Sequence, residues 1–142
     1  MSNFSSFMKK NKIKKENVKY AVTKSLTDEK GNPLEWEIKA VTTKEADKLR
    51  EECTTDVPVK GKPGMFRPKF NSSLYTAKLN VAAIVYPDLY NAELQDSYGV
   101  KTPEDLLKEM VDSPAEYMDL TTFVQTHSGF ESLQEKVDTA KN

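Results

Sequence analysis

Residues Leu26–Ala40 read LTDEKGNPLEWEIKA, and this stretch sets the fold class. Its middle, Asp28–Pro33, is rich in the residue types that favour tight turns. After the turn, Leu34, Trp36 and Ile38 alternate with charged residues. An alternation of period two is typical of a strand with one buried face. The stretch therefore predicts the turn and the second strand of a β-hairpin.

The first strand of this hairpin precedes the turn, because the same alternation starts at Val18. Pairing Leu26 with Leu34 across the turn brings the apolar residues of both strands onto one face. The pairs aligned in this way are Val22 with Ile38 and Tyr20 with Ala40. Two strands alone are marginally stable in water, so we expect helices or a third strand to cover this face.

The residues after Asn71 predict helices. Residues 74–86 are apolar on nearly every side, which is typical of a central, buried helix. Thr102-Pro103 and Ser113-Pro114 each combine a capping side chain with a proline at the first helical position. Gly129 is suited to end the second of these helices. A last helix is supported by Phe130, Leu133 and Val137.

One further helix follows the hairpin, because Thr42 and Glu45 form a capping box. Its apolar stripe consists of Ala46, Leu49 and Cys53. Together these signals predict a single α+β domain over residues 1–142. In it, an N-terminal β-hairpin, with or without a third short edge strand, packs on a C-terminal bundle of about five or six helices.

The segment Tyr86–Gly99 joins two of the predicted helices. Pro87 cannot continue the first helix, Asn91 is suited to cap the second, and Gly99 is suited to end it. Leu94 and Tyr98 lie one helical turn apart, so the second helix has an apolar side. The segment holds no histidine or cysteine, and we interpret it as a packing or docking element.

Two segments lie outside this framework. Residues 1–14 form a basic arm or a short helix. Residues 54–70 form a long basic loop with three prolines and two glycines, with or without a short edge strand at Met65–Phe70. Loops of this length in compact domains are often functional or mobile.

Charge is distributed unevenly over the 142 residues, although the net charge is only −1. Residues 1–70 hold 16 Lys and Arg against 10 Asp and Glu, and residues 71–142 hold 5 against 12. The two halves therefore carry +6 and −7. Such polarity can orient a chain on a partner or let copies associate head to tail, as a homo-oligomer. It is equally compatible with two solvated surfaces.

The sequence offers no set of residues for catalysis, for a cofactor or for a metal. His127 is the one histidine and Cys53 the one cysteine, so a typical zinc site cannot be assembled. Cys53 is expected to be buried, which disfavours a nucleophilic pair with His127. The phosphate-loop pattern fails, since Asp56 stands in place of its first glycine and Pro63 in place of its Ser or Thr. We predict a protein that is not an enzyme.

No apolar run reaches the roughly 20 residues needed to span a bilayer, so we expect a cytoplasmic protein. An alternative function is a small nucleic-acid-binding or regulatory protein. Its lysine-rich N-terminal arm would contact phosphates, and Phe4 and Phe7 would stack on bases. The acidic helical half and the isoelectric point of about 5.9 argue against it, because such modules are normally basic throughout.

In several blocks the sequence resembles the XkdN-like family of phage tail assembly chaperones. The blocks that carry the resemblance are residues 28–38, 49–54, 75–79, 85–89, 92–99, 114–117 and 129–130. The resemblance implies a non-enzymatic protein of the bacterial host cytoplasm. Such a protein would keep the long tape measure protein soluble and help to recruit tail tube subunits.

A chaperone of this kind needs apolar surface that it can offer to a partner. Methionine and aromatic side chains suit such surfaces, because they adapt to varied partners. We therefore expect six residues to contact the partner, with ordinary core packing as the alternative for each. They are Leu89, Tyr90, Leu94, Tyr98, Met110 and Met118.

Overall fold

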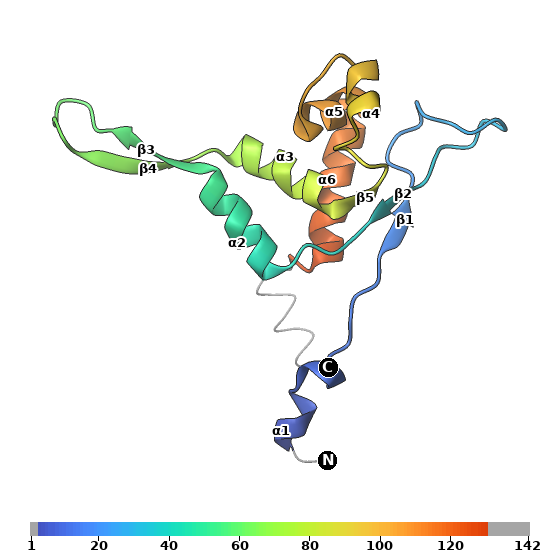
Figure 1. Ribbon diagram of the computed structural model, residues 1–142, viewed down its shortest axis with the longest axis horizontal. Coiled ribbons are helices and arrows are strands. Elements are labelled where there is room, and N and C mark those ends of the chain that lie inside the picture. Colours follow the sequence, from blue (N-terminus) through green and yellow to red (C-terminus); the bar gives the residue numbers. More distant parts are fainter. Residues whose placement is uncertain (1–2, 131–142) are drawn as a thin grey trace.

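The computed structural model describes residues 3–130 and confirms the α+β prediction (Figure 1). A three-stranded antiparallel sheet has the order β1-β2-β5, and a separate two-stranded sheet pairs β3 with β4. Within the described residues there are six α-helices, α1 to α6, and one 3-10 helix. Five of the α-helices follow the strand β2 in the chain.

The predicted hairpin exists, but its predicted register is wrong for the strands themselves. β1 (Val18–Tyr20) pairs with β2 (Trp36–Ile38) so that Val18 lies opposite Ile38 and Tyr20 opposite Trp36. The predicted alignment holds only beside the turn, where the Leu34 amide donates to the Leu26 carbonyl at 2.8 Å. The two registers differ by four residues. Because this number is even, the same side chains still face the core.

The cause of the shift is a contact with α6 (Pro114–Ser128). Residues 21–25 leave the sheet, and Thr23 becomes almost completely buried. The Thr23 hydroxyl donates to one carboxylate oxygen of Glu116 at 2.7 Å, and the Lys24 amide donates to the other at 2.8 Å. The Glu116 carboxylate thus binds residues 23–24, which lie outside the sheet.

The third strand of this sheet is not at Met65–Phe70. Helix α3 (Ser72–Ala83) is capped by Asn71 and ends earlier than predicted, and Ile84–Tyr86 forms β5. β5 lies antiparallel to β2, with Ile84 opposite Ile38. A short run of β-branched residues cannot be assigned to helix or strand by periodicity alone. Pro87 favours the strand, since a residue before proline prefers extended backbone.

Helix α2 (Thr43–Glu52) begins with the predicted Thr42–Glu45 capping box. The prediction of a loop over residues 54–70 is wrong for its first part, whereas the optional short strand at Met65–Phe70 is present as β4. β3 (Thr54–Pro58) and β4 (Phe66–Phe70) pair along their full length, and only residues 59–65 connect them. This hairpin extends away from the rest of the molecule (Figure 1).

The remaining helices begin where the sequence predicts. α4 (Ala92–Ser97), α5 (Pro103–Met110) and α6 have capping side chains that each accept a backbone hydrogen bond. These caps are Asn91, Thr102 and Ser113. Gly129 follows α6 at a φ of 84°, which favours glycine. The last predicted helix, with Leu133 and Val137, lies outside the described residues.

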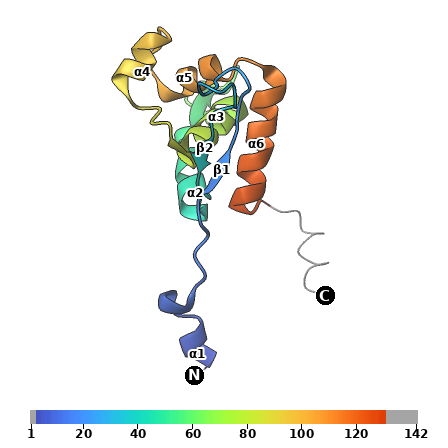
Figure 2. The same cartoon turned by 90° about the vertical axis from the view of Figure 1, so that its right-hand side faces the viewer.

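The core lies between the three-stranded sheet and the helices α3, α5 and α6. Figure 2 shows α6 alongside the sheet, and the rings of Tyr20 and Phe123 stack there at 4.1 Å. The largest fully buried apolar side chains come from both layers. They are Trp36, Ile38, Leu79, Leu89, Leu106, Leu107, Leu120 and Val124.

The N-terminal residues form short helical pieces that stand apart from this core (Figures 1 and 2). α1 (Asn3–Ser6) is followed by the 3-10 helix η1 (Lys9–Asn11). The side chains of Phe4 and Phe7 are largely exposed. As far as the structure describes it, the predicted arm or short helix over residues 1–14 therefore lies on the surface of the molecule.

The contact between Glu116 and residues 23–24 predicts a pH-dependent loss of stability. Hydrogen bonds from the Lys24 amide and the Thr23 hydroxyl lower the pKa of Glu116. The stabilisation is therefore complete above the ordinary Glu pKa of about 4.3, and it is lost as the pH falls through the lowered value. We expect Glu116→Gln to lower the urea midpoint at neutral pH.

The difference between Glu116→Gln and the wild type should disappear in acid, below the lowered pKa. Glu93→Gln is the matched control, because Glu93 is exposed on α4. Equal midpoints for Glu116→Gln and the wild type at neutral pH would show that the contact does not stabilise the fold.

Candidate functional site

Metal-binding side chains do not cluster in the part of the chain that the structure describes. Residues 3–130 contain no group of three His, Cys, Asp or Glu side chains that could hold a metal ion. Cys53 is buried as predicted, and burial raises the pKa of its thiol. A protonated, buried thiol is a poor nucleophile. The His127 ring stacks on Phe123, at 6.1 Å between centroids, near the end of α6.

The structure places the six predicted partner-contact residues in three different environments. Leu89 and Met110 are buried in the core, and Leu94 and Tyr98 are half-buried against it. Tyr90 and Met118 are 70% and 69% exposed. Only the last two residues thus offer most of their side chain to a partner.

The turn between β5 and α4 decides which way its side chains face. The Asp88 carboxylate accepts the Tyr90 amide at 3.0 Å, and the Gln95 amide group donates to the Leu89 carbonyl at 2.8 Å. With these bonds in place, Leu89 is 1% exposed while its neighbour Tyr90 faces solvent. Leu94 and Tyr98 fix α4 to the core behind this turn.

A shallow groove runs beside Tyr90 between α2 and α3. Its apolar lining consists of Tyr90, Leu49, Val81 and Ala82, which we call the tyrosine groove. Charged residues from three helices surround it. They are Glu45, Lys48, Glu52, Lys78 and Glu104.

Several of these charges are already paired. The Lys78 ammonium lies 3.4 Å from Glu104 and 3.9 Å from Glu52. Burial alone would raise the pKa of Glu45, but hydrogen bonds from Lys39 and Thr42 lower it overall. The groove therefore combines a short apolar strip with a charged rim of three acids and two bases, which suits a partner that presents both apolar and charged residues.

Sequence reasoning missed part of this surface. Leu49 was assigned to the buried stripe of α2, yet it is only partly buried and lines the groove. Tyr86 was assigned to a buried helix, yet it lies on β5 and is 65% exposed. The strand β3 was not predicted, because Pro58 and the other prolines of residues 54–70 favour a loop. Proline is tolerated on edge strands, and both strands of a two-stranded sheet are edge strands. Pro58 lies on β3 and Pro68 on β4 of this sheet.

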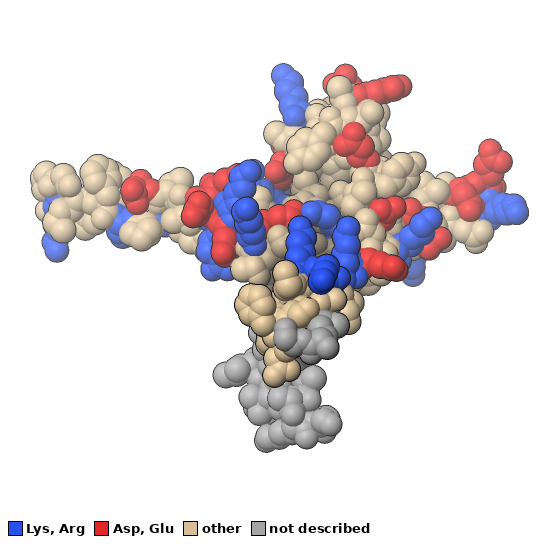
Figure 3. Space-filling model, turned by 60° about the horizontal axis from the view of Figure 1, so that its bottom comes forward, with Lys and Arg blue, Asp and Glu red and all other residues tan. Residues whose placement is uncertain are grey.

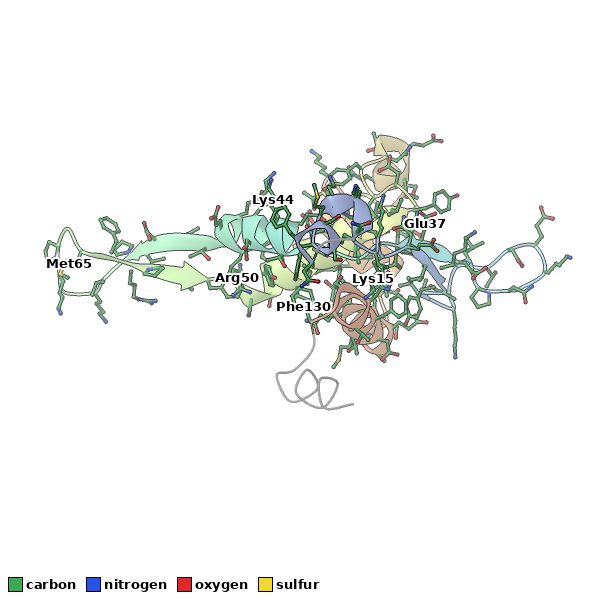
Figure 4. The ribbon with its side chains drawn as sticks, turned by 90° about the horizontal axis from the view of Figure 1, so that it is seen from below. Lys15, Glu37, Lys44, Arg50, Met65 and Phe130 are labelled. Carbon is green, nitrogen blue, oxygen red and sulfur yellow. The ribbon has the colours of Figure 1, made fainter. Side chains whose placement is uncertain are left out.

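Basic side chains gather where the N-terminal arm joins the body. Figure 3 shows Lys and Arg on this face, with uncharged side chains of the arm beyond them. Seen from below, Lys15 and Lys44 both lie on this side (Figure 4). Lys15 and Lys44 lie outside the predicted arm of residues 1–14, and nucleic-acid binding by the arm stays a hypothesis.

The fold is shared with a solved structure. The crystal structure of the protein YqbN matches with a TM-score of 0.76 at 26% sequence identity, covering 92% of this chain and 99% of that chain. The molecule is therefore a small α+β protein of the YqbN fold.

The sequence comparisons give the family. Residues 4–141 match the model of a family described as Phage XkdN-like tail assembly chaperone protein, and the chain belongs to this family. The resemblance found in the sequence is thus confirmed, and with it the general role in phage tail assembly. This is a family of chaperones, not a class of enzymes.

Two proteins of Bacillus subtilis strain 168 are similar over almost the whole chain. The phage-like element PBSX protein XkdN is 29% identical over 139 residues, which are 97% of this chain and 93% of the relative. The uncharacterized protein YqbN is 30% identical over 139 residues, which are 97% of this chain and 92% of the relative. Within the described residues, no helix is long and apolar enough to cross a membrane.

The contrast between Leu89 and Tyr90 predicts different effects of two neighbouring substitutions. Leu89→Ala removes a buried side chain and should lower the free energy of unfolding by about 2–5 kcal/mol. Tyr90→Ala removes an exposed side chain and should change it by no more than about 0.5 kcal/mol. Urea denaturation followed by Trp36 fluorescence measures both. A large loss for Tyr90→Ala would show that Tyr90 is needed for the fold.

Proposed function

We propose that this protein is a non-enzymatic tail assembly chaperone that binds the tape measure protein through the tyrosine groove. In the cytoplasm of the bacterial host, it would keep that protein available while tail tube subunits are recruited. Membership of the chaperone family supports the general role. The choice of surface rests on one observation, the exposure of Tyr90 beside a groove that has a short apolar strip and a charged rim.

The groove suits a helical partner. A recurring mode of recognition places the apolar face of an amphipathic helix in a groove of this kind. The family resemblance implies a long, coiled-coil tape measure protein, whose helices would present such a face. Leu49 and Ala82, which are partly buried, would contact its apolar residues, and Tyr90 would close one side. Large aromatic side chains often dominate the energy of such contacts.

Three further predicted residues extend this proposal. Leu94 and Tyr98 support Tyr90 from behind by holding α4 on the core. Met118 lies on α6, is mostly exposed, and is not among the residues that line the groove. We propose it as a second contact, since an unbranched side chain adapts readily to a partner.

Co-expression with the tape measure protein tests the proposed groove. The wild-type chain should co-purify with the tape measure protein and increase its soluble fraction. Tyr90→Ser should reduce the co-purified amount about tenfold or more, because a central aromatic contact commonly contributes at least 1.4 kcal/mol to binding.

Tyr86→Ser is the matched control for this experiment. Tyr86 has a similar exposure but does not line the groove, so its variant should retain the partner. Equal loss in both variants, or loss in neither, would place the binding surface elsewhere. A tape measure protein that is soluble alone and never co-purifies would contradict the proposed function itself.

A second candidate function is nucleic-acid binding by the N-terminal arm. The exposure of Phe4 and Phe7 beside clustered lysines favours it. If it holds, the chain should bind DNA with an affinity that falls steeply with salt, as counterion release requires. The double variant Lys12→Glu, Lys14→Glu should then bind much more weakly in a fluorescence anisotropy titration. No binding by the wild type at low salt would remove this candidate.

A further inference from the structure

The described part of the N-terminal arm, residues 3–14, presents a group of apolar side chains to solvent. Phe7 is 87% exposed and Ile13 is 92% exposed, and Phe4 and Met8 are exposed as well. The short helices α1 and η1 contain no buried residue. Apolar side chains scattered singly over a surface are ordinary, whereas a group of them marks an interaction site. The arm therefore offers apolar surface to a partner.

Lysines accompany these apolar side chains without any acid among them. Residues 3–15 contain five lysines and no Asp or Glu, and all five lysines are exposed. They are Lys9, Lys10, Lys12, Lys14 and Lys15. In Figure 3 basic side chains gather where the arm joins the body, and uncharged side chains of the arm project beyond them. The arm thus has an apolar outer part and a basic inner part.

A lipid surface with anionic headgroups fits this arrangement. Apolar side chains enter the boundary between headgroups and acyl chains, while lysines stay outside it and attract the anionic headgroups. The uneven charge of the chain would also orient the molecule. Residues 71–142 carry a net charge of −7, so an anionic surface repels them and attracts the arm.

Nucleic acid suits part of this arm but leaves its aliphatic side chains in water. Phe4 and Phe7 could stack on bases, as single-strand binding requires. Ile13 and Met8 have no ring to stack, although Ile13 is the most exposed large hydrophobic side chain of the described residues. At the edge of the acyl chains all four side chains lose contact with water, which is favourable. The composition of the arm therefore favours lipid over nucleic acid.

We propose that the N-terminal arm binds this protein to membranes that contain anionic phospholipid. The apolar side chains of the arm enter the interface, and its lysines contact the headgroup phosphates. This contact is peripheral, so it needs no helix that crosses the bilayer, and none is present among residues 3–130. So small an apolar group gives reversible binding. The proposal goes beyond the proposed function, because the tyrosine groove shares no residue with the arm.

Co-sedimentation of the purified full chain with phospholipid vesicles tests the role of charge. The wild type should bind vesicles of phosphatidylglycerol and phosphatidylcholine in equal parts, and should not bind phosphatidylcholine alone. Lys12→Glu with Lys14→Glu should weaken binding about tenfold or more, because both lysines would then repel the headgroups. Lys60→Glu with Lys62→Glu is the matched control. It makes the same change of charge between β3 and β4 and should bind like the wild type.

A second pair of variants tests the role of the apolar side chains. Phe7→Ser with Ile13→Ser should also weaken vesicle binding about tenfold or more, since both side chains are expected to enter the interface. Met65→Ser with Phe66→Ser is the matched control, because these two residues are also exposed but lie on the β3–β4 hairpin. Circular dichroism should show all four double variants folded, since every substituted residue is exposed.

Phe7→Trp reports insertion directly. The natural Trp36 is 2% exposed in the core, so a response to vesicles would come from position 7. The fluorescence of this variant should shift to shorter wavelength with anionic vesicles and stay unchanged with phosphatidylcholine alone.

Several results would overturn this anchor. They are a wild type that does not bind anionic vesicles, binding that survives the loss of Phe7 and Ile13, and equal losses in the hairpin controls. Binding of single-stranded DNA without binding of vesicles would assign the arm to nucleic acid instead. None of these measurements involves the tape measure protein, so the anchor and the proposed function fail or succeed separately.

Discussion

The burial of Trp36 and Ile38 on one face of β2 is the constraint on which the rest of the structure depends. β2 is the central strand, so β1 and β5 both pair with it, and the helices α3, α5 and α6 cover the face it presents. Burying each large apolar side chain stabilises the fold by about 1.5–3 kcal/mol. The other elements are arranged around this face, including the turn that places Leu89 in the core.

The surfaces proposed for binding contribute little to that core. Tyr90 lies at its margin, and the β3–β4 hairpin and the N-terminal arm stand outside it. A protein built in this way can change partner contacts without losing its fold.

Local signals in the sequence predicted much of this structure. The capping residues Asn91, Thr102 and Ser113 act through hydrogen bonds to amides three residues ahead, so the sequence shows them directly. The register of β1 could not be predicted, because it depends on Glu116, more than ninety residues away from Thr23 and Lys24. β5 was missed because an apolar run fits helix and strand alike. The exposure of Tyr90 beside a buried Leu89 depends on a turn whose conformation no periodicity encodes.

Site-specific photo-crosslinking in cells that also produce the tape measure protein tests the central claim most directly. A photoreactive amino acid at position 90 should give a crosslink to the tape measure protein, whereas the same amino acid at position 86 should give little or none. The two positions have similar exposure, so accessibility alone cannot produce the difference. A crosslink at position 86 or on the β3–β4 hairpin, with none at position 90, would contradict the tyrosine groove as the binding site.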